Sequence, residues 1–195
     1  MKNYVIIALV VVANLSMLLL ACNENKQEEV AEVAPTKEQL RLRGEYLVNA
    51  IGCDDCHSPK IMGPNGPEVD FSRRFSGHRS DAPIGKIDTK VINDWVLFGP
   101  EFTATVGAWG VSFAANITSD ETGIGSWTEQ QFFKAIREGK SKGLDGTRPL
   151  LPPMPWFMYK NLSDEDLRSI FTYLQSTEPV NNVVPAPIPM ENIAQ

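Results

Sequence analysis

Two cysteines and a histidine stand close together at Cys53, Cys56 and His57, in the segment Cys-Asp-Asp-Cys-His. This C-x-x-C-H spacing is the attachment signature of c-type haem. Two thiols separated by two residues could add across the two vinyl groups on one edge of a porphyrin. The histidine that follows could then bind the iron through one imidazole nitrogen. Because five residues can match by chance, the rest of the chain must supply an export route, a second iron ligand and a haem-sized core.

Two other uses of paired cysteines are disfavoured. A redox-active C-x-x-C is usually found near a βαβ pattern, which this sequence lacks, and it needs no adjoining histidine. Structural zinc requires four ligands, and only Cys53, Cys56, His57 and His78 could supply them, in a spacing that common zinc sites do not use. The third cysteine, Cys22, leaves no pair for a disulfide.

The first residues have the layout of a secretory leader. Lys2 precedes an apolar run over residues 5–20, and Leu-Leu-Ala-Cys follows, ending at Cys22. The run is short for a membrane span of ~20 residues. Leu-Leu-Ala-Cys resembles the lipobox of bacterial lipoproteins, which implies cleavage before Cys22 and acylation at this residue, with more than one acyl chain for stable anchoring. An uncleaved anchor helix is the alternative. Both place the protein outside the cytoplasm beside a membrane, in the periplasm or at the cell surface.

The charge balance is acidic. The chain has 24 acidic and 18 basic residues, a formal net charge of −6, and loses a further positive charge if Lys2 leaves with the leader. This argues against a nucleic-acid partner, and a protein that docks through charge should present a basic face. The expected organisation is a leader over residues 1–21, an acidic flexible tether over 22–36, one domain over 37–178 and a proline-rich extended tail over 179–195.

Three helices with recognisable N-terminal caps are expected in the domain. Capping boxes of Thr36 with Gln39 and of Thr128 with Gln131 predict helices from residue 37 to about residue 50 and from residue 129 to Gly139. Ser163, followed by three acidic residues, predicts a third helix with an apolar face. Residues 58–88 are rich in proline and glycine and predict a long loop that wraps a bound group. Residues 89–98 predict a short helix, and residues 102–115 predict one or two strands or a hairpin.

A second iron ligand is expected at Met154. Electron carriers fill the sixth iron position with methionine or histidine, whereas haem enzymes and gas-binding proteins leave it open. Met154 lies between prolines, and a residue before proline is pushed toward extended backbone. Such a stiff segment could hold a thioether against iron at little entropic cost. Met158 is the alternative, as a core or rim side chain, whereas Met62 is too near His57 and Met190 lies in the tail.

Three further expectations concern the surroundings of the motif. A carbonyl within residues 59–67 should accept the free N–H of His57 and fix its tautomer. His78 should lie on the surface or at the haem propionates, with axial ligation a minor alternative. Gly44 is unusual inside a helix, and indicates either a close crossing by another helix or a tolerated surface glycine.

The order of these parts resembles class I cytochrome c over roughly residues 38–177. More narrowly, several segments look like the haem domains in cytochrome subunits of membrane-bound bacterial dehydrogenases: Asn-Ile-Thr at 116–118, Gly-Ile-Gly-Ser-Trp-Thr at 123–128, Pro-Pro-Met-Pro at 152–155 and Leu-Ser-Asp-Glu-Asp-Leu at 162–167. Those subunits usually carry several C-x-x-C-H motifs, and this chain has one, with a longer segment between it and Trp127. Both departures favour a single-haem relative over a true dehydrogenase subunit.

The resemblance implies a mainly α cytochrome c fold of about three to five helices around one haem, with a long loop or β-hairpin insertion. The first and last helices would cross near the haem edge, at Gly44 and the Tyr173/Leu174 region. One haem c would be covalently bound through Cys53 and Cys56, with His57 as proximal and Met154 as distal iron ligand.

The function that follows from the resemblance is electron transfer without bond chemistry. A dehydrogenase or quinol-oxidising donor and an oxidase-type acceptor would be the redox partners. The alternative is a haem enzyme of peroxidase type or a haem-based sensor with a labile sixth ligand, for which His78 is the only obvious acid–base group.

Overall fold

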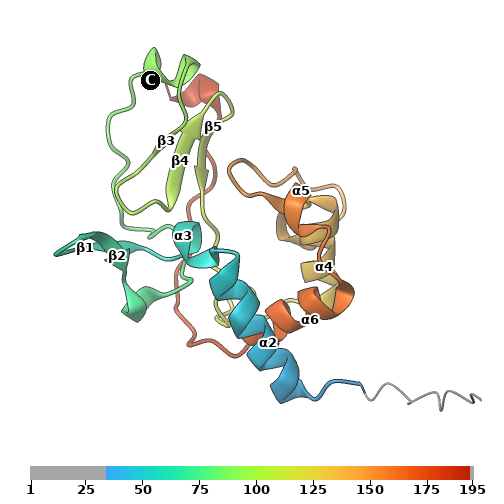
Figure 1. The fold of residues 1–195 in the computed structure, drawn as a ribbon. Coiled ribbons are helices and arrows are strands. Elements are labelled where there is room, and N and C mark those ends of the chain that lie inside the picture. Colours follow the sequence, from blue (N-terminus) through green and yellow to red (C-terminus); the bar gives the residue numbers. More distant parts are fainter. Residues whose placement is uncertain (1–33, 194–195) are drawn as a thin grey trace, which may run out of the picture. The chain divides into compact units, whose positions relative to one another are not determined.

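A computed structural model describes residues 34–193 of the chain (Figure 1). The expected leader, Cys22 and nearly all of the expected tether lie outside these residues. None of the helices within residues 34–193 has the length and apolar character needed to cross a membrane.

Two of the helices in residues 34–193 begin at the predicted caps. Helix α2 covers Lys37–Ala50, and its capping box is present: the Thr36 hydroxyl accepts from the Gln39 N–H, and the Gln39 side chain accepts from the Thr36 N–H. Helix α6 covers Asp164–Leu174, and the Ser163 hydroxyl accepts from the Asp166 N–H at 3.0 Å. Both helices form where predicted because these side chains satisfy N–H groups that have no partner within the helix.

Helices α2 and α6 pack directly against each other (Figure 1). Gly44 is buried at the contact. A Cβ atom at this position would overlap the carbonyl oxygen of Ser169 and lie 2.8 Å from the Cβ of Tyr173. The helix-crossing explanation of Gly44 is therefore confirmed. The apolar faces of the two helices form much of the main core, which includes Leu47, Val48, Leu167, Ile170 and Leu174.

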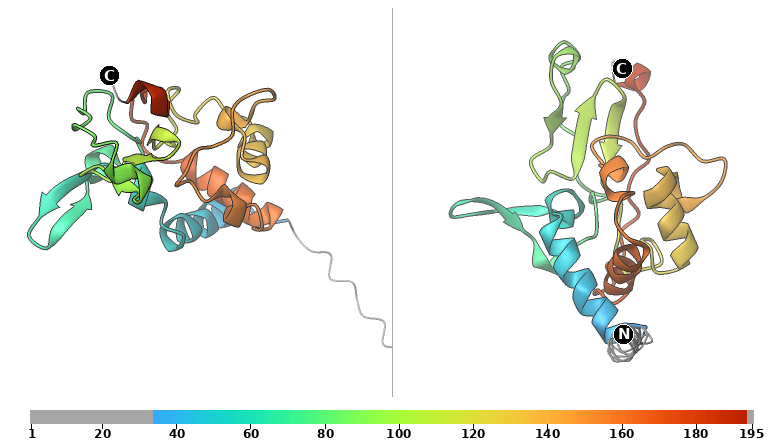
Figure 2. Two further views of the ribbon diagram at one scale, coloured as in Figure 1. Left: turned by 90° about the horizontal axis from the view of Figure 1, so that it is seen from above. Right: turned by 45° about the vertical axis from the view of Figure 1, so that its right-hand side comes forward.

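Helix α4, Glu129–Glu138, packs beside α6, and the short helix α5, Trp156–Tyr159, packs against α4. Helix α4 has the predicted capping box of Thr128 and Gln131 and ends at Gly139, whose φ is 63°. Its Phe132 and Ile136 join the main core. Helix α5 was not predicted from the sequence. Its position beside α4 can be seen in Figures 1 and 2.

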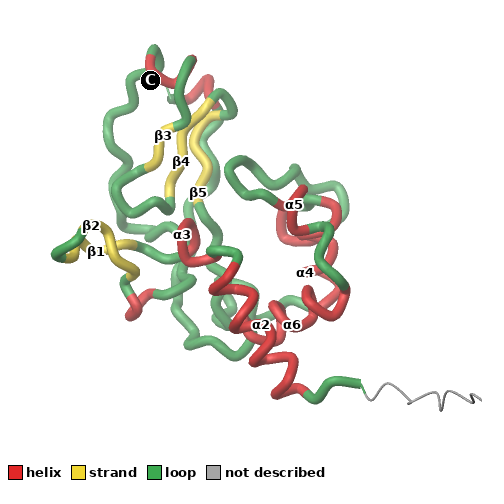
Figure 3. The backbone as a smooth tube through the Cα atoms, viewed as in Figure 1, coloured by secondary structure: helices red, strands yellow, loops and turns green. Residues whose placement is uncertain are grey.

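The strands form two small antiparallel sheets, separated by loops (Figure 3). The predicted hairpin is present as β4, Ala104–Gly107, and β5, Gly110–Phe113. Strand β3, Leu97–Phe98, pairs with β4. Strands β1, Lys60–Gly63, and β2, Gly66–Val69, form the other sheet. A second, smaller core contains Ile92, Val106 and Val111.

Two predictions for the middle of the chain were wrong. Residues 89–98 form no α-helix, only a 3₁₀ turn at Val91–Asn93 followed by β3. Of their apolar side chains only Ile92 is buried, so there is no continuous face that a helix could bury. Residues 58–88 are not wholly irregular, because β1 and β2 form a hairpin around a two-residue turn at Pro64 and Asn65. Proline first and glycine after such a turn are the residues it favours.

The proline-rich tail is extended as far as a 3₁₀ turn at Met190–Asn192, and it also contacts the domain. Ile188 exchanges two backbone hydrogen bonds with Val111 of β5, at 2.8 and 3.0 Å. The side-chain amide of Asn182 donates to the carbonyls of Ser76 and His78, at 2.7 and 2.8 Å. Residues 179–193 therefore hold loop 76–78 and β5 together.

A candidate haem site around Cys53, Cys56 and His57

A left-handed glycine turns the chain from α2 into the cysteine motif. Gly52 has a φ of 73° and precedes α3, Cys53–His57, a single helical turn. Other residues would be strained in this backbone conformation, which glycine adopts freely. Cys53 and Cys56 are three residues apart in α3 and so lie on the same side of it. Both are half-buried free thiols.

The surroundings keep both thiols protonated near neutral pH. Burial, reinforced by the carboxylates of Asp54 and Asp55, raises the pKa of Cys53 to about 12. Burial and Asp55 also raise the pKa of Cys56. Redox-active cysteines have lowered pKa values, because the thiolate is the nucleophile. The environment therefore disfavours a dithiol–disulfide role and is compatible with thiols that are consumed in a permanent covalent bond.

His57 is held by a carbonyl far along the chain. Its Nδ1 lies 2.7 Å from the carbonyl oxygen of Ala115. The predicted acceptor within residues 59–67 was wrong, because residues 60–69 form the β1–β2 hairpin, whose backbone groups pair with each other. Burial lowers the pKa of His57 although the hydrogen bond to Ala115 opposes this. A neutral ring that donates through Nδ1 has a free lone pair on Nε2, which is the form that binds a metal.

Met154 lies in the same hydrophobic cluster as Cys53. It is partly buried, and its N–H donates to the Leu151 carbonyl at 3.3 Å. The segment before it is tied to β5, because the Ser112 hydroxyl donates to the Pro152 carbonyl at 2.6 Å. The prolines and this hydrogen bond together restrict the backbone that carries the Met154 thioether.

The other methionines within residues 34–193 lie elsewhere. Met62, in β1, is 80% exposed, and Met158, in α5, is 61% exposed. Met190 packs against the second core, with Ile92. Of these methionines, Met154 is the one that shares a cluster with the cysteine motif, which favours it as an iron ligand.

His78 is not on the surface. It is only 5% exposed, so the surface alternative was wrong, and a contact with haem propionates stays a prediction. Its Nδ1 lies 2.9 Å from the Thr103 hydroxyl and its ring stacks on Phe113, whereas Nε2 has no hydrogen-bond partner. Burial lowers the pKa of His78, and the ring is therefore neutral near pH 7.

These residues fit a covalently attached haem. Two thiols on one helical turn could bond to one edge of the ring, the neutral imidazole of His57 offers Nε2, and Met154 offers a thioether from a restrained loop. When bound, a haem supplies the reversible one-electron chemistry of its iron. The protein would attach the ring through the two thiols, whereas the Ala115 carbonyl fixes the tautomer of His57 and the main core places apolar side chains beside Cys53 and Met154. Within residues 34–193, no group of three His, Cys, Asp or Glu side chains could hold a bare metal ion.

Comparison with known proteins gives the same cofactor. The chain is 29% identical over 165 residues to the fructose dehydrogenase cytochrome subunit of Gluconobacter japonicus, covering 83% of this chain and 26% of that protein. It is 33% identical over 138 residues to the gluconate 2-dehydrogenase cytochrome c subunit of Pantoea cypripedii, covering 70% and 23%. Its homologues are cytochrome c subunits of dehydrogenases. Haem c is therefore the cofactor that homology implies.

A third relative is also named as the cytochrome c subunit of a dehydrogenase. The chain is 28% identical over 152 residues to the alcohol dehydrogenase (quinone) cytochrome c subunit of Gluconobacter oxydans, covering 77% of this chain and 24% of that protein. No family model matches the chain. The chain spans about a quarter or less of the length of the curated relatives that it matches.

The structure adds residues to the site that sequence reasoning missed. Ala115 accepts from His57, Ser112 anchors the Met154 segment, and Arg74 binds the carboxylate of Asp54 inside the cysteine motif. Ala115 contributes only a backbone carbonyl, so its side chain carries no signal. For Arg74 the only sequence signal is that a basic residue lies twenty positions after an aspartate. This arrangement is too common in proteins to predict an ion pair.

Proposed function

We propose that this chain is an electron-transfer protein that carries one covalently bound haem c in a mainly α fold of the cytochrome c type. Cys53 and Cys56 form thioethers to the haem, and His57 and Met154 are the axial ligands of the iron. The observation that carries the proposal is the 2.7 Å contact between Nδ1 of His57 and the Ala115 carbonyl. This hydrogen bond occupies Nδ1 and leaves the lone pair of Nε2 free to bind the iron.

The proposed partners are redox proteins. The names of the relatives support a dehydrogenase as electron donor, and a quinol-oxidising enzyme is the alternative donor. An oxidase-type protein is the proposed acceptor, because a methionine ligand raises the potential of the iron. A lipid on Cys22 is proposed to hold the protein at a membrane, in the periplasm or at the cell surface. The single C-x-x-C-H motif supports one haem.

Replacing both motif cysteines should abolish covalent haem attachment. The full-length protein, exported in a host that attaches c-type haem, should keep its haem through denaturing electrophoresis. The double variant Cys53→Ser with Cys56→Ser should lose it, because no thiol remains to form a thioether. Haem staining of the gel is the measurement. Cys22→Ser is the matched control and should retain haem, since Cys22 is the proposed lipid attachment residue. Haem that stays with the double variant after denaturation contradicts the proposal.

Replacing Met154 should open the sixth position of the iron. Met154→Ala should lose the iron–sulfur charge-transfer absorption, lower the midpoint potential and bind cyanide or carbon monoxide faster than the wild type. Met158→Ala, at an exposed methionine four residues away, should change none of these. If Met158→Ala gives the loss instead, the ligand assignment is wrong. If the wild type itself binds these ligands rapidly, the sixth position is labile and the protein is a haem enzyme or sensor.

A further inference from the structure

Helix α3 cannot hold its own position. It has five residues, none of its side chains is fully buried, and no side chain caps its N-terminus. A single helical turn is unstable alone, because nucleating a helix fixes several backbone angles for one hydrogen bond. The orientation of His57, its last residue, must therefore come from contacts with the rest of the protein.

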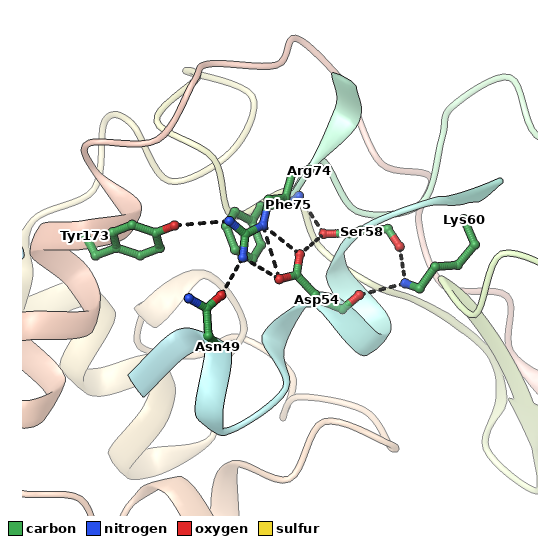
Figure 4. A network of polar contacts seen from close by, with 7 residues as sticks. All are labelled: Asn49, Asp54, Ser58, Lys60, Arg74, Phe75 and Tyr173. Carbon is green, nitrogen blue, oxygen red and sulfur yellow. Dashed lines mark hydrogen bonds and ion pairs between the residues drawn. The ribbon is translucent and has the colours of Figure 1, made fainter. Parts of the chain in front are cut away.

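The strongest of these contacts is an ion pair inside the cysteine motif. Arg74 meets the Asp54 carboxylate with two nitrogens: Nη2 is 2.6 Å from Oδ2, and Nε is 3.0 Å from Oδ1 (Figure 4). The Ser58 hydroxyl also donates to Oδ1, at 2.6 Å. Burial raises the pKa of Asp54, but the hydrogen bonds from Arg74 and Ser58 outweigh it and lower the pKa below its ordinary value. Such two-nitrogen pairs fix geometry as well as charge.

The same guanidinium joins α3 to both crossing helices. Its Nη2 donates to the side chain of Asn49 in α2 at 2.6 Å, and its Nη1 donates to the hydroxyl of Tyr173 in α6 at 3.3 Å. Its carbon also lies 4.4 Å from the centre of the Phe75 ring. Figure 4 shows these groups converging on Arg74 from separate elements. The side chain of Arg74 therefore ties α3 to the α2–α6 pair.

The backbone that follows Arg74 holds the end of α3 at two residues, His57 and Ser58. Phe75, which has a strained φ of 63°, donates its N–H to the Ser58 hydroxyl at 2.8 Å and accepts from the Ile117 N–H at 2.9 Å. Gly77 donates its N–H to the carbonyl of His57 at 2.8 Å. The segment at 75–78 is thus bonded both to the end of α3 and to residues 114–117, which include the Ala115 carbonyl. A non-glycine residue keeps a left-handed backbone only when its surroundings enforce it.

We propose that Arg74 is a positioning residue for the iron ligand His57. Its pair with Asp54 fixes the start of segment 75–78, and this segment in turn holds both the carbonyl of His57 and residues 114–117, which present the Ala115 carbonyl to the imidazole. Arg74 would thereby maintain the tautomer and orientation of the ring. The inference rests on the proposed function, because it concerns how the proposed haem ligand is held.

The test uses the full-length, haem-loaded protein and separates positioning from charge. Arg74→Gln and Asp54→Asn each break the ion pair. Both should speed deuterium exchange of the Nδ1 proton of His57, followed by NMR, because the hydrogen bond from Nδ1 to the Ala115 carbonyl is held less firmly. The midpoint potential of Arg74→Gln should lie below that of Asp54→Asn, because one variant removes a positive and the other a negative charge near the iron. Arg73→Gln, at an exposed neighbour, should leave the exchange rate unchanged.

Failure of the positioning role can be distinguished from failure of the proposed function. Wild-type protein without covalent haem contradicts the proposed function before any variant is made. In haem-loaded protein, an exchange rate in Arg74→Gln equal to that in Arg73→Gln overturns the positioning role. If Arg74→Gln does not fold, Arg74→Lys replaces it, because lysine keeps the charge but not the two-nitrogen geometry. Faster exchange in Arg74→Lys supports the proposal, and unchanged exchange overturns it.

Discussion

Gly44→Ala is expected to be strongly destabilising although alanine is the better helix former. The new Cβ would overlap the carbonyl oxygen of Ser169 and lie 2.5 Å from its carbonyl carbon. These are backbone atoms inside α6, so they cannot move aside as a flexible side chain could. The helices would have to separate. We expect a net loss of about 2 kcal/mol, since overpacking costs up to ~3 kcal/mol and the gain in helix propensity returns only ~1 kcal/mol.

The measurement is the urea midpoint of the variant against that of the wild type. Gly85→Ala is the matched control, because its Cβ would meet nothing within 4 Å. There the same substitution should be neutral or slightly stabilising, through the unfolded chain. Equal midpoints for Gly44→Ala and Gly85→Ala would mean that α2 and α6 do not pack as closely as described.

The helices could be predicted because their signals are local. The capping boxes of Thr36 and Thr128 and the cap of Ser163 each act within three residues, and all three are present in the structure. Glycine at the helix crossing was also foreseeable, although the sequence alone could not separate a crossing from a surface position. Its partner residue Ser169 is more than a hundred positions away.

The middle of the chain was harder because its structure depends on distant partners. Several apolar residues in 89–98 favoured a helix. Of these only Ile92 is buried, in the second core with Val106 and Val111. The hairpin at residues 60–69 did have a local signal, in Pro64, Asn65 and the glycines around them. That signal was outweighed by the general richness in proline and glycine.

The side chains of the candidate site could be proposed from the sequence, whereas its backbone contacts could not. Cys53, Cys56, His57 and Met154 belong to patterns whose chemistry can be recognised from residue type and spacing. The acceptor for His57 is a main-chain oxygen 58 residues away, which any residue at position 115 could supply. The expectation of a nearby carbonyl failed because sequence reasoning favours local partners, whereas segment 75–78 brings residues 114–117 to the histidine.

Gly77→Ala is expected to disturb the proposed ligand His57 strongly. Gly77 has a φ of 75°, and a Cβ there would lie 2.5 and 2.6 Å from the carbonyl carbon and oxygen of Ala115. The added methyl would displace the oxygen that accepts from Nδ1 of His57. Without that hydrogen bond the imidazole is a less basic ligand, so the midpoint potential should rise and the Nδ1 proton should exchange faster. The loss of stability should be about 3 kcal/mol, from left-handed strain and overpacking together.

The effect of left-handed backbone strain can be separated from the displacement of the Ala115 carbonyl by substituting a second glycine. Gly146 has a φ of 73°, nearly that of Gly77, but a Cβ there would meet nothing within 4 Å. Gly146→Ala should therefore cost roughly 1 kcal/mol for the left-handed backbone alone and leave the potential unchanged. If both variants lose the same stability and neither shifts the potential, the Ala115 carbonyl does not control the ligand. A shift in Gly77→Ala alone would show that a main-chain oxygen, positioned by a residue without a side chain, helps to set the properties of the iron.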